Sequence, residues 1–401
     1  MEVQNENRET KLHPIALHWG QQEFIQGKTA SKYNLSLSTS LSNVCRELDV
    51  ELVRGWNIDN DYSWGGTGHY KIAALACDIV STKKLKKLLA ANKDNIAFED
   101  DAMLKDAIKN IDSKQFCPLA DVPDLVWRNT RKLDEANHFA DMDESNSNVI
   151  DGKTLLEACK NTSNIDVDFW NSYYEGMEAE DSSKSSLKRG ALPFRVWQAF
   201  DLMVEYVKQG KLAEFICVGG TVSHYLGDAC QPLHISFLHH GHPGKNESKV
   251  HAAYETQMMD SKMQELFNGV NKKLLNKTHN YNTYKTGKEA ARSVIKLMDK
   301  VCNDILSPEE VIEAFNEVSG RGRIKNMWEK LGDRTIKCVA EGSINLALFW
   351  ESAWTAGDGD TVFKDADLKT IKKDKLSDLY NDKTFFPSFR LKDPKFKAAL
   401  K

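Results

Sequence analysis

The sequence predicts an all-α protein built around a single large multi-helix domain. Leu, Ala, Lys and Glu recur at helical period through long segments, whereas alternating runs of Val, Ile and Thr are few. Only nine of the 401 residues are proline, and no two segments carry the turn signature of a β-hairpin. Helices are therefore expected to provide nearly all of the regular structure.

Composition places the chain among ordinary soluble globular proteins. The net charge is −4, with 28% charged and 41% apolar residues, a balance that neither requires nor excludes nucleic acid. No apolar run approaches the roughly 18 residues of a membrane span, and the first thirty residues do not resemble a secretory signal. The eight cysteines are scattered, which is typical of reduced thiols. We expect cytoplasmic residence by default, or secretion by a route without a cleavable signal.

The predicted organisation has three parts. Residues 1–63 form an N-terminal extension of unknown role, in which 38–53 has the spacing of one amphipathic helix. Residues 64–357 form the helical domain, with a polar insertion at about 144–192. Residues 358–401 form a short, basic and aromatic tail.

Within the helical domain, apolar spacing predicts successive helices. A helix opens after Ser63-Trp64-Gly65-Gly66-Thr67-Gly68-His69 with an apolar stripe that begins at Ile72, and a Lys-rich helix follows at about 82–93. The insertion carries a helix at 152–161, and Pro193 starts the next helix. The spacing then predicts helices at 212–228 and from 249 to about 268, polar helices through 320, and a buried helix at 336–356.

The stretch 221–255 carries the strongest chemical pattern. His224 and Asp228 lie four residues apart in one predicted helix, and His251 and Glu255 lie four apart in the next, so each pair shares a helix face. His234 lies between the two pairs. One such pair is typical of a salt bridge on a helix surface, but two pairs with a further histidine exceed what one tetrahedral ion needs. The pattern predicts a site for more than one metal ion.

Other candidate residues are less specific on their own. His69 begins an apolar-faced helix, Asp124 follows a proline at a helix start, and His138 lies in a loop, all positions that are often structural. His239, His240 and His242 belong to a Gly- and Pro-containing loop, where solvated histidines are common, so they are not assigned to the site.

Four pieces together resemble the superfamily of zinc-dependent phospholipase C and fungal single-strand-specific nucleases. They are WGGTGH at 64–69, Asp124 with HFADMD from His138, HYLGDACQPLH at 224–234 and HAAYE at 251–255. They occur in the order found in that superfamily and span about half of the chain.

The resemblance implies an all-α fold that holds three zinc ions. It assigns the ligands residue by residue: Asp124, His138, His224 and Asp228 to the first ion; His234, His251 and Glu255 to the second; Trp64, His69 and the other oxygen of Asp228 to the third. It further implies hydrolysis of a phosphodiester by water activated between two cations. Asp124 is then the catalytic group that orients or deprotonates this water, and Arg128 is a candidate for binding substrate phosphate.

Two features depart from the superfamily. Its tryptophan ligand is the mature N-terminal residue, whereas Trp64 is internal here. Either residues 1–63 are removed or the third site is altered, because a peptide nitrogen is a poor metal ligand near neutral pH. The motif WGxxGH resembles the nucleases, whereas Glu255 resembles the phospholipases.

The sequence leaves three functions open. The expected activity is a zinc phosphodiesterase of the phospholipase C type acting on phospholipid head groups. The alternatives are a single-strand-specific endonuclease and 3′-nucleotidase acting on single-stranded nucleic acid, and a non-catalytic zinc-binding protein.

Overall fold

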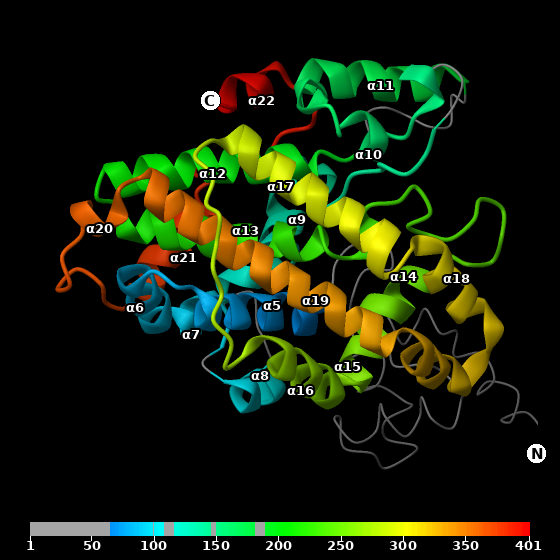
Figure 1. Cartoon of the computed structure of the whole chain (residues 1–401), viewed down its shortest axis with the longest axis horizontal. Helices are drawn as coiled ribbons and strands as arrows, with labels where there is room; N and C mark the ends of the chain where they lie inside the picture. Colours follow the sequence, from blue (N-terminus) through cyan, green and yellow to red (C-terminus); the bar gives the residue numbers. More distant parts are fainter. Residues whose placement is uncertain (1–64, 99, 108–115, 146–149, 181–188) are drawn as a thin grey trace, which may run out of the picture. The chain divides into compact units, whose positions relative to one another are not determined.

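A computed structural model describes residues 65–401, except 99, 108–115, 146–149 and 181–188 (Figure 1). These residues belong to the unit Tyr62–Lys401. All regular structure in the described residues is helical, which confirms the predicted fold class. The more specific prediction of the phospholipase C and nuclease fold is not established by the helical content. The helix expected at 38–53 lies outside the described residues.

The described part of the chain forms a succession of α-helices. Their bounds are α5 (Gly65–Ile79), α6 (Lys83–Ala91), α7 (Lys93–Ile96), α8 (Asp101–Ala107), α9 (Arg128–Thr130), α10 (Leu155–Ala158), α11 (Val167–Glu180), α12 (Leu192–Lys208), α13 (Leu212–Asp228), α14 (Val250–Ala252), α15 (Met259–Ser261), α16 (Met263–Leu274), α17 (Gly287–Lys300), α18 (Pro308–Glu317), α19 (Arg323–Ala356), α20 (Gly359–Val362), α21 (Lys373–Asn381) and α22 (Pro394–Ala399). Short 3-10 or π-helical turns that matter for the site are η3 (Leu119–Asp121), η4 (Pro123–Trp127), η5 (Glu135–Asn137), η9 (Pro232–His234) and η10 (Ala253–Met258).

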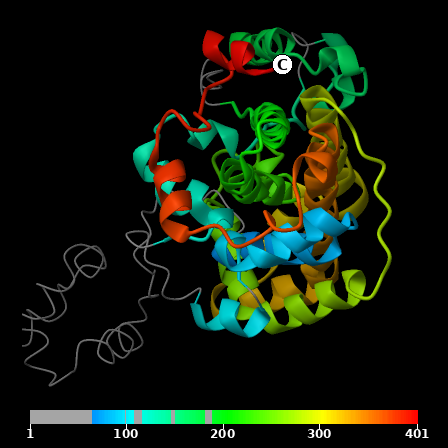
Figure 2. The same cartoon turned by 90° about the vertical axis from the view of Figure 1, so that its left-hand side faces the viewer.

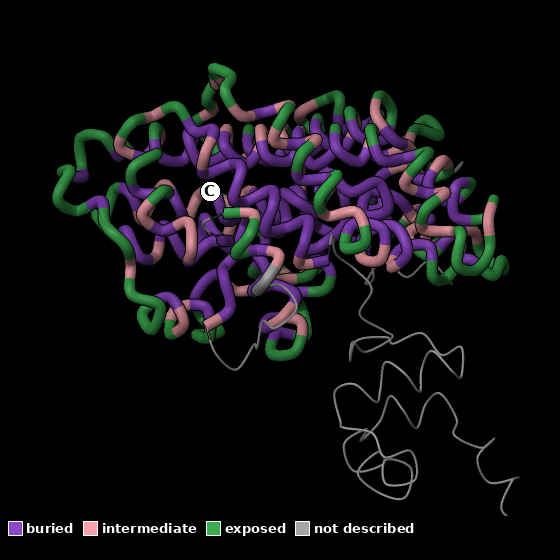
Figure 3. Tube along the Cα trace, turned by 90° about the horizontal axis from the view of Figure 1, so that it is seen from below, coloured by how far each residue is buried: buried purple, intermediate pink, exposed green. Residues whose placement is uncertain are grey.

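Helix α13 lies at the centre of this unit. It packs against α12, α5, α19 and the η3 turn, and α19 crosses α5 as well (Figure 1). Every residue of α13 except Glu214 is buried. The helix is therefore buried around its whole circumference, as expected of a helix with neighbours on all sides, and it carries the polar side chains of His224 and Asp228 into the interior. The buried part of the trace follows the inner helices, and exposed residues gather at outer turns (Figure 3).

The predicted helices mostly occur where the spacing placed them. The prediction for 212–228 matches α13, Pro193 is the second residue of α12, and 336–356 forms the C-terminal part of the longer α19. The segment 249–268 differs, because it is not one regular helix. The chain passes from α14 through the π-helical turn η10 to α15, and Lys262 leaves helical geometry before α16.

Residues 358–401, expected to form a basic tail, contain α20, α21 and α22 and run beside the central helices (Figure 2). The guanidinium of Arg131 donates hydrogen bonds to four main-chain carbonyls of this segment, those of Tyr380, Asp382, Phe385 and Phe386. Burial of these polar groups is stable because each carbonyl has a charged donor.

Two further findings concern the described residues. None of their helices is both long and apolar enough to cross a lipid bilayer. Their cysteines are buried and no disulfide joins them.

Candidate metal centre

The site begins with the C-terminal turn of α13. Because one helical turn separates them, His224 and Asp228 point in the same direction, with His224 Nε2 at 3.5 Å from Asp228 Oδ2. Both side chains are fully buried. His224 Nδ1 donates to the carbonyl oxygen of Ala120 at 3.0 Å, which leaves Nε2 as the ring nitrogen that faces the acids.

A first group forms where Asp124, from η4, and His138, directly after η5, meet His224. His138 Nδ1 lies 3.1 Å from His224 Nε2, and Asp124 Oδ1 lies 3.4 Å from that same nitrogen. Asp228 Oδ2 closes the group at 3.1 Å from His138 Nδ1. Ligand atoms of a tetrahedral zinc ion with bonds of about 2.0–2.1 Å are separated by about 3.3 Å, so these spacings suit one ion.

A second group consists of His234, from η9, with His251 and Glu255 from the segment α14–η10. The two Nε2 atoms of His234 and His251 are 3.1 Å apart, and Glu255 Oε2 lies 3.0 Å from His251 Nε2. In both imidazoles, Nδ1 donates a hydrogen bond to a main-chain carbonyl oxygen. His234 donates to that of His138 at 2.8 Å, and His251 donates to that of His239 at 2.9 Å. These bonds fix the ring tautomers with both Nε2 atoms toward Glu255.

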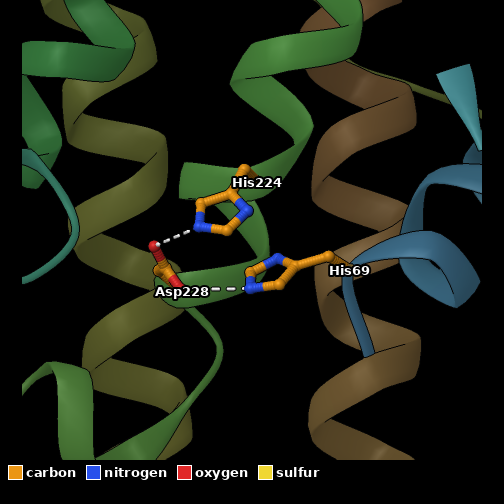
Figure 4. A group of neighbouring side chains, drawn as sticks. All are labelled: His69, His224 and Asp228. Atoms are coloured by element: carbon orange, nitrogen blue, oxygen red, sulfur yellow. Dashed lines mark ion pairs between the residues drawn. The ribbon is translucent and has the colours of Figure 1, made fainter. Parts of the chain in front are cut away.

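A third group joins His69, from α5, to Asp228 and His224 (Figure 4). His69 Nε2 lies 3.5 Å from Asp228 Oδ1, and the rings of His69 and His224 stack with centroids 3.7 Å apart. Asp228 thus presents one oxygen to His69 and the other to His138. Trp64, the remaining ligand expected for this ion, lies outside the described residues.

These three groups of buried histidines and acids could each hold a metal ion. The chemistry of the donors fits this use, because imidazole nitrogen and carboxylate oxygen are the usual ligands of zinc where thiolates are absent. The Oδ1 atom of Asp228 is buried and accepts no hydrogen bond from the described residues. A buried acceptor of this kind costs stability unless a cation or donor meets it.

Protonation within the centre favours metal binding. Burial lowers the pKa of His138 and of His234 to about 4 and that of His69 well below its usual value, so these imidazoles are neutral at pH 7. Burial and the neighbouring Asp124 raise the pKa of Asp228 well above its usual value. Such crowding of buried acids is relieved by a cation placed between them.

Asp124 and Arg128 contact each other directly. Arg128 Nε lies 2.9 Å from Asp124 Oδ1, one helical turn away. Burial raises the pKa of Asp124, but Arg128 and His224 outweigh burial and hold it well below its usual value. Asp124 is therefore ionised and positioned beside the first group. The catalytic role of Asp124 and the substrate contact of Arg128 stay predictions.

Some residues near the centre were not predicted. Asp134 accepts from His138 Nε2 at 3.1 Å, and Gln231 Nε2 donates to Glu255 Oε2 at 3.1 Å. The spacing of four between Asp134 and His138 was visible in the sequence, but nothing there indicated a shared face. Asp121 is also buried, 3.7 Å from His224 Nδ1.

The loop histidines, excluded from the site above, take no part in the three groups. His242 instead contacts Glu247 and Glu309, at 2.8 and 3.1 Å. His239 contributes its main-chain carbonyl to His251.

The sequence is similar to that of a curated protein. No family model matches the chain. The chain is 36% identical to a protein of Bradyrhizobium tropiciagri named as a probable serine protease, over 88% of the chain and 51% of that protein. The chain therefore spans about half the length of the curated relative that it matches.

This finding overturns the identification with the zinc phospholipase C and nuclease superfamily. The prediction of a phosphodiesterase that acts on phospholipid head groups or single-stranded nucleic acid was wrong, since the similar protein carries a peptidase name. The physical reason lies in what the motifs specify. HYLGDACQPLH and HAAYE describe how donors are spaced around cations, and the same donor geometry can serve the hydrolysis of different bonds.

The relative's name directs attention to serine nucleophiles. A catalytic serine must hydrogen-bond a histidine that is itself oriented by an acid. The ring nitrogens of His138, His224 and His234 contact acids, main-chain carbonyls and other imidazoles. The Ser388 hydroxyl donates to Asp134, and Asp134 in turn accepts from His138. Here the acid lies between the serine and the histidine, whereas in a catalytic triad the histidine lies between the serine and the acid.

Proposed function

We propose that this chain is a metal-dependent hydrolase whose reaction centre is the cluster of buried histidines and acids around Asp228. The observation that carries the proposal is the meeting of these ligands from four distant segments, with ring nitrogens 3.1 Å apart in two of the groups. Zinc is the first candidate ion, because the donors are nitrogen and oxygen in small, closed groups.

In the proposed reaction the ions and the surrounding residues have different roles. When bound, the ions would lower the pKa of water and polarise the bond to be cleaved. Neutral His138 and His234 keep their lone pairs for coordination, and ionised Asp124 is placed beside the first group to orient the attacking water.

Peptide bonds are the first substrates to test, because the name of the relative is that of a peptidase. A serine peptidase is the second candidate function for the same reason. The two candidates differ in what inhibits them. A metal chelator removes the ions of the first, whereas a sulfonyl fluoride modifies the nucleophile of the second.

The test combines metal analysis with inhibition of peptidase activity. The full chain is purified, its zinc content is measured by elemental analysis, and cleavage of fluorescent casein and mixed peptides is followed with phenanthroline or with phenylmethylsulfonyl fluoride. We expect two or three zinc ions per chain, loss of activity with phenanthroline and recovery with zinc.

The variant H224A should lose both the activity and part of the metal, whereas H279A should retain both. His279 contacts the main-chain oxygen of Leu274 and lies outside the three groups, so it is a matched control. Activity that resists the chelator and is abolished by the sulfonyl fluoride would support the serine peptidase instead. A purified chain that binds no divalent metal overturns the proposal.

A further inference from the structure

Asp134 lies on the side of His138 that faces away from the metal centre. His138 Nε2 is 3.1 Å from Asp134 Oδ2, while Nδ1 of the same ring points to His224 and Asp228. Asp134 is fully buried. A buried carboxylate needs several donors, and one imidazole N–H satisfies only part of its capacity.

Two hydroxyls supply the other donors, and both reach the second carboxylate oxygen. Ser388 Oγ donates to Asp134 Oδ1 at 2.5 Å, and Tyr225 Oη lies 2.9 Å from the same oxygen and 3.1 Å from Oδ2, with the shorter contact to Oδ1. The buried guanidinium of Arg195 lies 3.6 Å from this oxygen and provides a counter-charge. The carboxylate is therefore held by its Oδ1 atom, with Oδ2 directed at the imidazole.

Ser388 comes from the C-terminal segment, 254 residues from Asp134 in the sequence. Arg195 fixes the position of this segment, because its guanidinium donates to the carbonyl oxygens of Pro387 at 2.8 Å and Phe386 at 3.3 Å. The Arg195 guanidinium also stacks on the Phe386 ring, 3.4 Å from its centroid. This segment thus reaches the layer directly behind the metal centre.

We propose that Asp134, held by Tyr225 and Ser388, positions His138 and keeps its proton on Nε2, so that Nδ1 offers its lone pair to a cation. The proposal rests on the proposed function for the presence of the cation. According to this proposal, the C-terminal segment supports a metal ligand through Ser388. Asp134 is a positioning residue, because it acts through His138 and touches neither the cation nor a substrate.

The substitution D134N tests the proton placement directly. Tyr225 and Ser388 would keep the amide oxygen of the new side chain in place of Oδ1, and its NH2 group would then face His138 Nε2. An NH2 group requires an acceptor there, which forces the histidine proton onto Nδ1 and blocks coordination. We expect one ion fewer per chain, or metal affinity about 10- to 100-fold weaker at this group.

Two spectroscopic measurements distinguish positioning from a structural effect. Nitrogen NMR of the metal-free, histidine-labelled protein should show the Nε2–H tautomer of His138, and D134N should shift it to Nδ1–H. Cobalt substitution should show a changed visible absorption for D134N. The control is E351Q, since Glu351 is another buried carboxylate, and its hydrogen bonds within the described residues come from Ser81 and Thr82 at a helix start. E351Q should leave tautomer, spectrum and metal count unchanged.

S388A supplies an independent measurement if D134N does not fold. Removing this hydroxyl loosens Asp134 without placing a donor against His138, so we expect metal affinity to fall by up to about tenfold while the helical content stays constant. The control S343A removes a buried hydroxyl that donates to the carbonyl oxygen of Val339 one turn earlier in α19.

The outcomes separate this inference from the proposed function. A wild-type chain that binds zinc, with D134N and S388A binding it equally well, overturns the inference alone. The Nδ1–H tautomer in the wild-type protein does the same. A wild-type chain that binds no metal overturns both.

Discussion

Asp228 Oδ2 lies 3.1 Å from His138 Nδ1, although 90 residues separate the two in the sequence. The other oxygen of Asp228 lies 3.5 Å from His69 Nε2. One carboxylate therefore faces two of the three ligand groups. Together with His224 it connects those groups, so its removal should affect both.

Replacing Asp228 by Asn should lower the metal content more than replacing a residue that belongs to only one ligand group. The amide supplies one neutral oxygen where the carboxylate supplied two charged ones, so we expect zinc to be lost or weakened at least about 100-fold in two groups. Elemental analysis and competition with a chromogenic chelator measure this. The control D143N removes a largely buried carboxylate that accepts from the main-chain N–H of Phe237 and should retain all ions. An unchanged zinc content in D228N contradicts the shared role.

Replacing His251 by Ala should empty only the second group. His251 Nε2 lies 3.0 Å from Glu255 Oε2, and the remaining two ligands hold an ion poorly without it. We expect one ion fewer per chain with the first group intact. His242 provides the comparison, because it also pairs with a carboxylate, at 2.8 Å from Glu247, but outside the three groups. H242A should bind as much zinc as the wild type, and equal losses in the two variants would argue against the grouping.

Replacing Gly227 by Ala should displace His69. A Cβ atom at Gly227 would lie 2.7 Å from His69 Nδ1, closer than the ring can tolerate. Alanine favours the helix by up to about 1 kcal/mol, so secondary structure should persist while the third group is disturbed. We expect weaker zinc binding at that group.

The matched control for G227A is G219A, two turns earlier in α13. There the Cβ atom meets the flexible methyl of Met203 at 3.0 Å and Trp350 Nε1 at 3.3 Å, and neither residue belongs to a ligand group. Zinc binding should be unchanged in G219A. Unchanged zinc binding in G227A would show that the present position of His69 is not required for the third group to hold its ion.

The metal-free protein should lose stability as the pH falls from about 6.5 to 4. His138 and His234 have a pKa of about 4 in the folded state, against about 6.5 for an unfolded histidine. Between these values the unfolded state binds more protons, so acid favours unfolding, whereas above pH 7 both states are neutral and stability is constant in this respect. Thermal unfolding in EDTA at pH 7.5, 6 and 5 measures the slope.

The double variant H138Q/H234Q isolates the contribution of these two imidazoles. It should flatten the dependence of melting temperature on pH relative to the wild type. A comparison with the wild type is needed because burial raises the pKa of Asp143 and Asp201 to about 6, which acts in the opposite direction. Identical slopes in the two proteins would contradict the assignment.

The identification made from motifs shows where local patterns mislead. His224 with Asp228 and His251 with Glu255 were correctly placed on common faces, because a spacing of four is set by the helix itself. The same residues also suggested a phosphodiesterase, and the peptidase name of the similar protein corrects this. Donor spacing describes how cations are held, whereas the bond that is cleaved depends on the surroundings of the site.

The sequence alone determined the helical class, the extent of α13 and the local ligand pairs, since each depends on residues within a few positions of one another. Spacing alone did not bring Asp124 and His138 to α13, whereas the tertiary structure shows this contact. The tertiary structure alone decided that a π-helical turn replaces a regular helix at Glu255 and that Ser388 reaches Asp134. Those contacts join residues as far as 254 positions apart. They are set by the packing of whole helices, which no short pattern of residues encodes.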